Sequence, residues 1–272
     1  MEISCCMNEF LEIIAYKKIW VYGAGYVANR FLEALKKHGM ESHVQGYIVS
    51  QKKEDQEYIN GLPVKSIENM VVDDASIICI AVHEVYKNQI ELELTQRDIF
   101  HYIWIYPFLC ELYMGMPIKE KEWVDTIKII PKDERQYAMA VRWAAISDFY
   151  GIYPGGLMLY KRAMAIHSNA DTGEARAIRF INLIKDWDTY GYRPMWQISI
   201  NTHFEIIDGE HRVALALYHG QAQVQCKIYD GNNIHEKKTL MTEEVLLDGG
   251  FIREEISGLD EINKFIKNMI HR

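Results

Sequence analysis

The chain has 272 residues, of which 49% are hydrophobic and 25% are charged, and its formal net charge is −8. This composition excludes a disordered chain and is typical of a globular protein with one large domain or two ordinary ones. The negative charge argues against a DNA partner, because affinity for nucleic acid comes mainly from Lys and Arg side chains that neutralise phosphates.

The apolar segments, the first residues and the cysteines indicate in which cellular compartment the protein is expected. No window approaches the roughly 18 uninterrupted apolar residues that a membrane span needs, so we expect no membrane span. The first ten residues lack the basic segment and apolar core of a signal peptide. The five cysteines are odd in number and form no CxxC pair, which is typical of a reducing compartment. We therefore expect a cytoplasmic protein, with Cys79 and Cys226 as ordinary core residues.

The N-terminal part is expected to be an α/β domain. Apolar runs predict strands at residues 17–22, 44–49, 75–82 and 102–106. A helical pattern follows the first run, with Val27, Phe31 and Leu35 on one face and His38-Gly39 at its end. This alternation of strands and helices favours a mostly parallel sheet with helices on its faces.

A glycine motif lies between the first predicted strand and helix. Gly23 permits a tight turn, Gly25 lets the backbone approach a pyrophosphate, and Ala28 allows close contact between helix and strand. The helix N-terminus then offers free N–H groups to an anion. Ser50 stands where an NAD-binding domain usually carries Asp or Glu, so the predicted cofactor site of Gly23, Gly25, Ala28 and Ser50 disfavours NAD.

These segments carry a family resemblance. The order "KKIWVYGAGYVANRFLEAL", "VQGYIVS", "INGLPV" and "ASIICIAV" resembles the small Rossmann-like domains of bacterial surface-polysaccharide and sugar-modifying proteins. The resemblance implies a Rossmann-like, nucleotide-binding-type domain over residues 1–108. It leaves open a docking or regulatory domain that binds no dinucleotide.

The middle of the chain, residues 109–156, is expected to be a helical linker, because Tyr137, Val141 and Ala144 recur at helical spacing. Helices are predicted at 158–166 and 175–187, joined by a loop at 169–173 in which Asp171 or Thr172 caps the second helix. We expect four aromatic side chains of this region to lie in an interdomain core: Trp143, Phe149, Tyr150 and Tyr160.

The C-terminal part is expected to be an α+β domain over residues 157–272. Strands are predicted at 195–200, 204–207 and 224–228, and a helix at 210–218. The order is strand, glycine turn, helix and strand, and Glu-His-Arg lies at the opening of the helix.

The residues around this opening suit phosphate chemistry. Gly209 can take the conformation of a sharp turn, and the first amides of the helix face an anion. Arg212 and His211 add donors. Asp208 and Glu210 are carboxylates suited to bind Mg²⁺ or to accept a proton. The alternative is a plain turn, in which Arg212 pairs with a nearby glutamate on a solvated helix start.

The sequence "YGYRPMWQISINTHFEIIDGEHRVALALYHGQAQVQCKIY" resembles the ParB/sulfiredoxin-like superfamily. Sulfiredoxins have a catalytic cysteine where this chain has Glu210, and CTP-binding ParB proteins have arginine where it has His211. The free-serine kinases of the superfamily have Asp-Gly-His-His-Arg, which Asp208, Gly209, His211 and Arg212 match. The likeness therefore implies a nucleotide-dependent kinase or hydrolase. On the preceding helix and loop it implies Glu174 or Asp171 as the catalytic acid and Arg176 as a further phosphate ligand.

Together these patterns predict an enzyme that uses ATP or CTP with Mg²⁺ and transfers or cleaves phosphate. Its acceptor would be a small hydroxyl-bearing metabolite, with surface-glycan synthesis as the expected context. Two alternatives remain: a non-enzymatic nucleotide-sensing module and an NAD-dependent nucleotide-sugar oxidoreductase. A homo-oligomer stays open. The predicted catalytic residues are Asp208, Glu210 and Glu174; the predicted phosphate ligands are Gly209, His211, Arg212 and Arg176; and the predicted Mg²⁺ ligands are Asp208 and Glu210.

Overall fold

The computed structural model describes residues 7–51, 57–83, 86–130, 136–166, 170–194, 198–231 and 241–270. The chain forms two compact units, Met1–Met116 and Pro117–Arg272, and the fold is mixed α/β. Over the described ranges, no helix is both long and apolar enough to cross a membrane.

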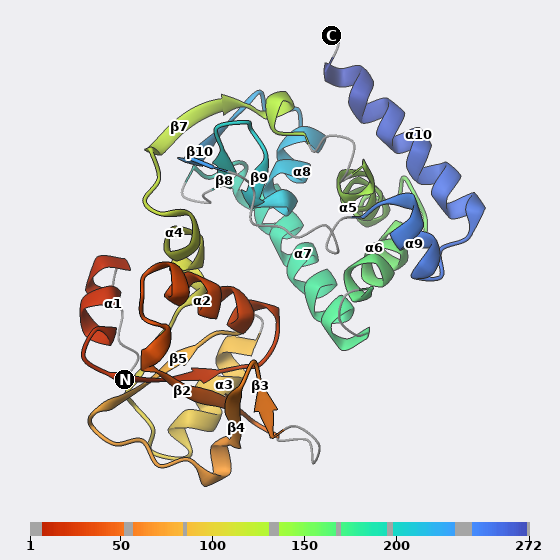
Figure 1. Ribbon diagram of the computed structural model, residues 1–272. Coiled ribbons are helices and arrows are strands. Elements are labelled where there is room, and N and C mark those ends of the chain that lie inside the picture. Colours follow the sequence, from red (N-terminus) through yellow and green to blue (C-terminus); the bar gives the residue numbers. More distant parts are fainter. Residues whose placement is uncertain are drawn as a thin grey trace. The chain divides into compact units, whose positions relative to one another are not determined.

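The first unit contains a six-stranded sheet and its helices (Figure 1). The strand order is β3-β4-β2-β1-β5-β6, and every neighbouring pair is parallel except β3 with β4. The predicted parallel strands are confirmed as β1, β2, β5 and β6. The elements are α1 (Met7–Ile14), β1 (Lys18–Tyr22), α2 (Tyr26–Lys37), η1 (Glu41–His43), β2 (Val44–Val49), β3 (Tyr58–Ile59), β4 (Leu62–Ser66), η2 (Ile67–Asn69), β5 (Ser76–Ile80), α3 (Lys87–Thr95), β6 (Tyr102–Trp104), η4 (Tyr106–Phe108) and α4 (Leu109–Met114).

Alternate strand residues bury two cores on opposite faces of this sheet. Val21 and Cys79 contribute to one face, where residues of α1, α2 and α4 pack. Tyr22 and Ile80 contribute to the other face, together with residues of α3. Helices therefore cover both faces, as the alternation of elements predicts. The carboxyl ends of β1 and β5 are the point where the strand order reverses, which is the usual ligand edge of such sheets.

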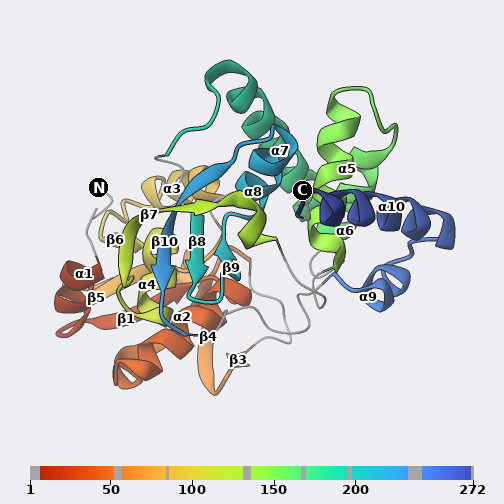
Figure 2. The same cartoon turned by 90° about the horizontal axis from the view of Figure 1, so that it is seen from above.

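The second unit contains a four-stranded sheet and six α-helices among its described residues. Figure 2 shows the strand order β7-β10-β8-β9, in which β8 and β10 are parallel and the two outer pairs are antiparallel. The elements are β7 (Lys119–Asp125), η5 (Thr126–Ile129), α5 (Gln136–Phe149), α6 (Gly156–Ala165), α7 (Ala170–Tyr190), β8 (Ile198–Asn201), β9 (Ile206–Asp208), α8 (Glu210–Tyr218), β10 (Gln223–Tyr229), α9 (Glu243–Asp248) and α10 (Arg253–Ile270).

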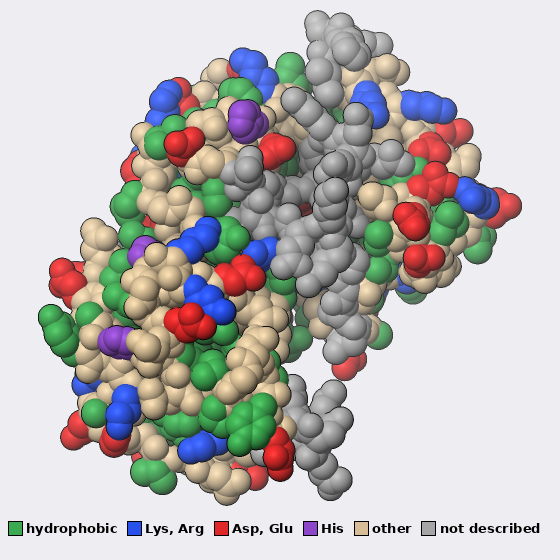
Figure 3. Space-filling view, viewed as in Figure 1, with side chains coloured by type: hydrophobic (Ala, Val, Ile, Leu, Met, Phe, Trp, Pro, Cys, Tyr) green, Lys and Arg blue, Asp and Glu red, His purple; other side chains and the backbone are tan. Residues whose placement is uncertain are grey.

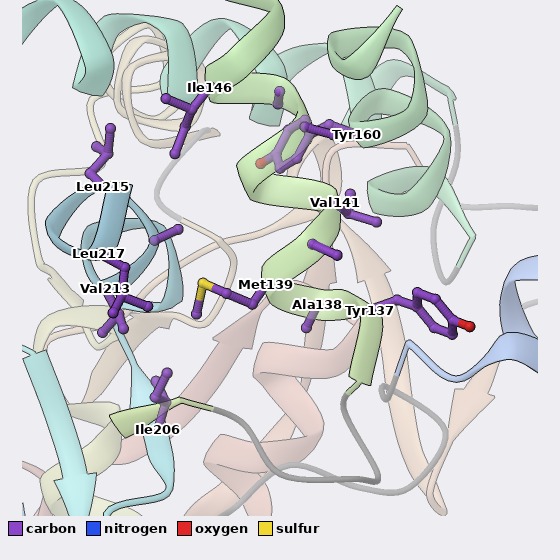
Figure 4. Close-up of a cluster of buried hydrophobic side chains, with 14 of the residues drawn as sticks. Tyr137, Ala138, Met139, Val141, Ile146, Tyr160, Ile206, Val213, Leu215 and Leu217 are labelled. Atoms are coloured by element: carbon purple, nitrogen blue, oxygen red, sulfur yellow. The ribbon is translucent and has the colours of Figure 1, made fainter. Parts of the chain in front are cut away.

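Helix α5 is the centre of this unit. Its sequence is apolar all round, which is typical of a buried helix, and it packs against α6, α8 and α10. In Figure 4, Met139 of α5 points toward Val213 and Leu217 of α8. The α8 helix, which follows the predicted phosphate motif, is thus anchored by its apolar side to α5.

The predicted helical linker at 109–156 is wrong for Lys119–Asp125, which form β7 and pair with β10. Strand β7 lies at the edge of the sheet and has Val124 as its one buried residue, so the alternation that reveals a strand is missing. Residues 109–114 form α4 of the first unit, and α5 belongs to the second. Of the aromatics expected in an interdomain core, Tyr160 is buried within the second unit and Tyr150 is partly exposed.

Two further boundaries differ from the predictions. Helix α7 begins at Ala170, so Asp171 and Thr172 lie inside its first turn rather than before it. Gly173 lies inside α7. A side chain at this position would overlap the carbonyl oxygen of Lys161 on α6, so the glycine permits close contact between the two helices. Strand β9 begins at Ile206, because Phe204 has φ of 62° and lies in the turn. Residues 195–197 of the predicted first strand lie outside the described ranges.

The turn between β1 and α2 has the geometry that the glycine motif predicts. Gly23 has φ of 108°, and a Cβ there would meet the Val82 side chain and lie 2.8 Å from the carbonyl oxygen of Ala81. Gly25 precedes α2, and a Cβ there would have nothing within 4 Å. Ala28 is fully buried. Gly23 is therefore needed by the fold, whereas the backbone at Gly25 is open to approach.

Gly23→Ala and Gly25→Ala should separate these two roles. Gly23→Ala is expected to lower the free energy of unfolding of the first unit by about 2 kcal/mol, because it adds a side chain at positive φ against Val82. Gly25→Ala should cost at most about 1 kcal/mol. Native-state hydrogen exchange of the β1 and β5 amides measures both, and equal costs would contradict this division.

Candidate functional site

The turn between β9 and α8 places the predicted phosphate motif. Asp208 is the last residue of β9, and Gly209 adopts φ of 101° directly before α8. The Gly209 carbonyl accepts hydrogen bonds from the amides of Arg212 (2.9 Å) and Val213 (3.0 Å). No side chain caps the helix. The strand, glycine turn and helix predicted from the sequence are therefore present, and the helix opens with its positive dipole end uncapped.

Four arginines lie near enough to His211 for their positive charges to act on its imidazole. Arg142 comes from α5, Arg176 and Arg179 from α7, and Arg212 from α8. Burial, followed by the positive charges of these arginines, holds the pKa of His211 well below its usual range. The imidazole is therefore neutral at pH 7, and the positive charge of the site resides on guanidinium groups.

The two carboxylates of the motif are each paired with an arginine. Arg142 Nη2 donates to Glu210 Oε2 at 2.5 Å, and these side chains are only 5% and 18% exposed. Arg212 Nη2 donates to Asp208 Oδ2 at 2.9 Å, on the more exposed side of the turn. Arginine side chains are therefore direct neighbours of both carboxylates of the motif.

Arg142 is a buried cation in the middle of the apolar helix α5. Its Nη1 donates to the carbonyl oxygen of Ala138 at 2.6 Å and its Nη2 donates to Glu210. Its Nε is buried and has no hydrogen-bond partner, and no other side-chain nitrogen or oxygen of the described residues shares that condition. A buried donor without a partner costs about 1–3 kcal/mol, so this nitrogen lowers the stability of the described structure.

Two aromatic side chains, Tyr160 and Phe180, contact the His211 ring. Tyr160 of α6 is fully buried, and its hydroxyl lies 2.6 Å from Nε2 of His211. The Phe180 ring of α7 meets the imidazole edge to face at 4.7 Å between ring centres. Burial raises the pKa of the Tyr160 hydroxyl to about 12, so this hydroxyl is also neutral at pH 7. The predicted phosphate ligand is thus fixed by two aromatic neighbours.

The structure gives the predicted residues on α7 different surroundings. The Glu174 carboxylate lies 2.7 Å from Nζ of Lys161 on α6 and is 54% exposed, and no contact of Glu174 with Glu210 or His211 is present in the described ranges. Arg176 belongs to the group around His211, with its Nη1 3.5 Å from the carbonyl oxygen of Met164. The structure therefore brings together Asp208, Gly209, Glu210, His211, Arg212 and Arg176, and it leaves Glu174 aside.

Sequence reasoning missed Arg142 and Arg179, and it assigned Tyr160 only to the core. Two signals were available. Arg142 is the one charged residue in the apolar run of residues 137–147. Arg179 follows Arg176 by three positions, so both lie on one face of α7.

In the first unit, Ser50 at the end of β2 is engaged internally. The Ser50 and Tyr22 hydroxyls both lie within 2.7 Å of Glu93 Oε2, which α3 supplies. Burial, and next the bonded Glu93, raise the pKa of Tyr22. A carboxylate is therefore present near this strand end, but two hydroxyls already occupy it. This arrangement offers no free group to hold ribose hydroxyls as the acidic residue of NAD-binding domains does.

Metal-binding groups and surface charge add two observations. Over the described ranges, no group of three or more His, Cys, Asp and Glu side chains could hold a metal ion. Cys79 and Cys226 are buried, as expected. On the face that Figure 3 shows, Lys and Arg alternate with Asp and Glu rather than gathering in a patch of one sign.

The two predicted catalytic glutamates should respond differently to loss of charge. Glu210→Gln is expected to lower the free energy of unfolding by about 3 kcal/mol, because it leaves the buried Arg142 cation without its carboxylate and close to three further arginines. Glu174→Gln, the matched control, should cost less than about 1 kcal/mol, since its ion pair is at the surface. Urea denaturation followed by circular dichroism measures the free energy of unfolding of both variants. Equal losses would show that the Arg142–Glu210 pair adds no more stability than the surface pair of Glu174.

Comparison with protein-family models, curated sequences and solved structures finds no match to this chain.

Proposed function

We propose that the second unit binds the phosphates of ATP or CTP at the N-terminus of α8 and transfers or hydrolyses the terminal phosphate. One observation carries the proposal: the charges of four arginines from three helices act on His211, and the buried Nε of Arg142 has no hydrogen-bond partner in the described chain. Such a set of donors suits a multiply charged anion, and its cost in stability is offset when that anion binds.

Backbone amides and arginine side chains would each bind different phosphate oxygens. No side chain caps α8, so the first backbone amides of this helix would be available to donate to a phosphate. The planar guanidinium group of Arg212 can donate to two phosphate oxygens at once, and the Nε of Arg142 would supply a further N–H donor. A phosphate oxygen then competes with Asp208 for Arg212, because both accept from the same guanidinium group.

Mg²⁺ fits this site as part of the nucleotide complex. The Asp208 carboxylate is about half exposed and pairs with Arg212 through Oδ2, and the Glu210 carboxylate lies two residues further along the chain. Mg²⁺ is commonly bound by one or two carboxylates together with substrate phosphates and water. The metal would therefore draw its ligands from the phosphates and from Asp208 or Glu210, and it would neutralise charge on the transferred group.

The reaction would use a carboxylate as proton acceptor. The hydroxyl oxygen of the acceptor, or of water, forms a bond to the terminal phosphorus, and the bond from that phosphorus to its bridging oxygen breaks. The hydroxyl proton passes to Asp208 or Glu210, and a nucleoside diphosphate leaves. The geometry favours these two residues over Glu174, because the Glu174 carboxylate pairs with Lys161.

The two family resemblances suggest a chemical class for the acceptor of the phosphate. Asp208, Gly209, His211 and Arg212 repeat the pattern of the free-serine kinases of the ParB/sulfiredoxin-like superfamily, which supports a small hydroxyl-bearing metabolite. The parallel sheet and the open Gly25 turn of the first unit support the predicted Rossmann-like domain, whose sequence resembles domains of surface-polysaccharide proteins. We place the acceptor in surface-glycan synthesis on this basis.

A nucleotide-sensing module without turnover is the second candidate. Both carboxylates that could accept a proton are paired with arginines, which favours binding over chemistry. Incubation with Mg²⁺–ATP or Mg²⁺–CTP for several hours separates the two functions, since an enzyme releases nucleoside diphosphate and a sensor returns the triphosphate intact.

Nucleotide binding tests the proposal directly. Titration calorimetry with ATP, CTP and GTP, with and without Mg²⁺, should show binding of ATP or CTP. Arg212→Ala should weaken this binding at least tenfold, because a charge-assisted hydrogen bond contributes about 1.5–3 kcal/mol. Arg142→Met should weaken it by a similar factor.

Arg253→Ala is the matched control for these variants, because Arg253 is exposed and pairs with Glu243 away from the motif. Its affinity should equal that of the unaltered protein. The proposal fails if no nucleotide binds, or if Arg212→Ala and Arg253→Ala bind equally well.

A further inference from the structure

The contact between Tyr160 and His211 determines which nitrogen of the imidazole carries the proton. The Tyr160 hydroxyl lies 2.6 Å from Nε2 of His211 and is fully buried. Within the described ranges this hydroxyl has no second hydrogen-bond partner. A tyrosine hydroxyl has one proton to donate, whereas an imidazole nitrogen is either a donor or an acceptor.

Only one assignment of protons leaves no buried donor unpaired. If Nε2 carried a proton, Tyr160 would have to accept it, and the hydroxyl proton of Tyr160 would be buried without an acceptor. That arrangement costs about 1–3 kcal/mol. If Tyr160 donates, Nε2 accepts and both groups are satisfied. The neutral ring then has its proton on Nδ1.

The same reasoning excludes a doubly protonated ring, in which both nitrogens are donors. The hydrogen bond from Tyr160 therefore leaves one proton on the ring.

We propose that Tyr160 is a positioning residue that holds His211 with its proton on Nδ1, so that His211 presents a neutral N–H donor to the bound phosphate. The second half rests on the proposed function. Among the described residues Nδ1 has no hydrogen-bond partner, and the side chain of His211 keeps a partly exposed surface. The donor is therefore available to a ligand.

This assignment gives His211 a different role from the histidine of many hydrolases. With Nε2 occupied by Tyr160 and Nδ1 protonated, the ring has no free lone pair, so it cannot accept the proton of an attacking hydroxyl. Proton acceptance falls to a carboxylate, and His211 contributes orientation of a phosphate oxygen without adding charge.

Nitrogen NMR of the full chain, labelled with ¹⁵N and free of ligand, tests the first half. The chain has ten histidines, and the His211→Gln variant identifies the signal of His211 by its loss. We expect a protonated Nδ1 and an unprotonated Nε2 at pH 7. In Tyr160→Phe the protons should redistribute toward Nε2. Tyr137→Phe is the control, because this buried tyrosine bonds Asp260 instead, and it should leave His211 unchanged.

A protonated Nε2 in the unaltered protein would overturn the assignment, and so would a His211 signal unchanged by Tyr160→Phe. The first of these readouts needs no variant at Tyr160, so it stands even if Tyr160→Phe does not fold. Affinity for Mg²⁺–ATP and Mg²⁺–CTP tests the second half: Tyr160→Phe should weaken binding about 3- to 10-fold, as loss of one oriented hydrogen bond would. If the expected tautomer is seen but neither nucleotide binds, the phosphate role fails and the proton assignment remains.

Discussion

The buried ion pair between Arg142 and Glu210 is the interaction on which the second unit depends. It joins α5, the central helix of the core, to the first residue of α8. Helix α8 in turn connects β9 to β10, so the pair fixes the turn at Gly209 relative to the whole sheet. A buried cation is tolerated in an apolar helix only when a partner compensates its loss of hydration. Glu210 is that partner, which makes it a structural residue before any role in chemistry.

The candidate site concentrates arginine side chains around one imidazole. Arg142, Arg176, Arg179 and Arg212 all depress the pKa of His211, and two of them pair with Glu210 and Asp208. Tyr160 and His211 add hydrogen bonding without adding charge. Under the proposed function, repulsion among these guanidinium groups would be relieved when an anion binds.

The sequence predicts those features that follow from local patterns. The apolar runs of β1, β2 and β5 are buried on both faces, and Gly23 and Gly209 lie at turns that need positive φ. These elements could therefore be found without the structure. Strand β7 could not, because its exposed charged residues mask the alternation and its pairing with β10 joins segments about a hundred residues apart. The start of α7 was missed because Gly173 was interpreted as a loop residue, although helix contact with α6 requires it.

The candidate site divides in the same way. Asp208 to Arg212 are consecutive, so their convergence at a helix start follows from the chain itself. Arg142 and Tyr160 reach His211 from α5 and α6, which only tertiary contacts bring near α8. Glu174 was chosen by analogy with a preceding helix, and its pairing with Lys161 is a surface contact that spacing does not reveal.

Strand β7 also determines where this unit begins. The resemblance to a known superfamily starts well after residue 157, yet β7 and α5 lie before that position and supply an edge strand and the central helix. A fragment cut at residue 157 would leave the backbone of β10 unpaired along one side and uncover the apolar faces of α6 and α8. Both are exposed surfaces that promote aggregation. The compact unit that contains the motif begins at Pro117, and it includes β7 and α5.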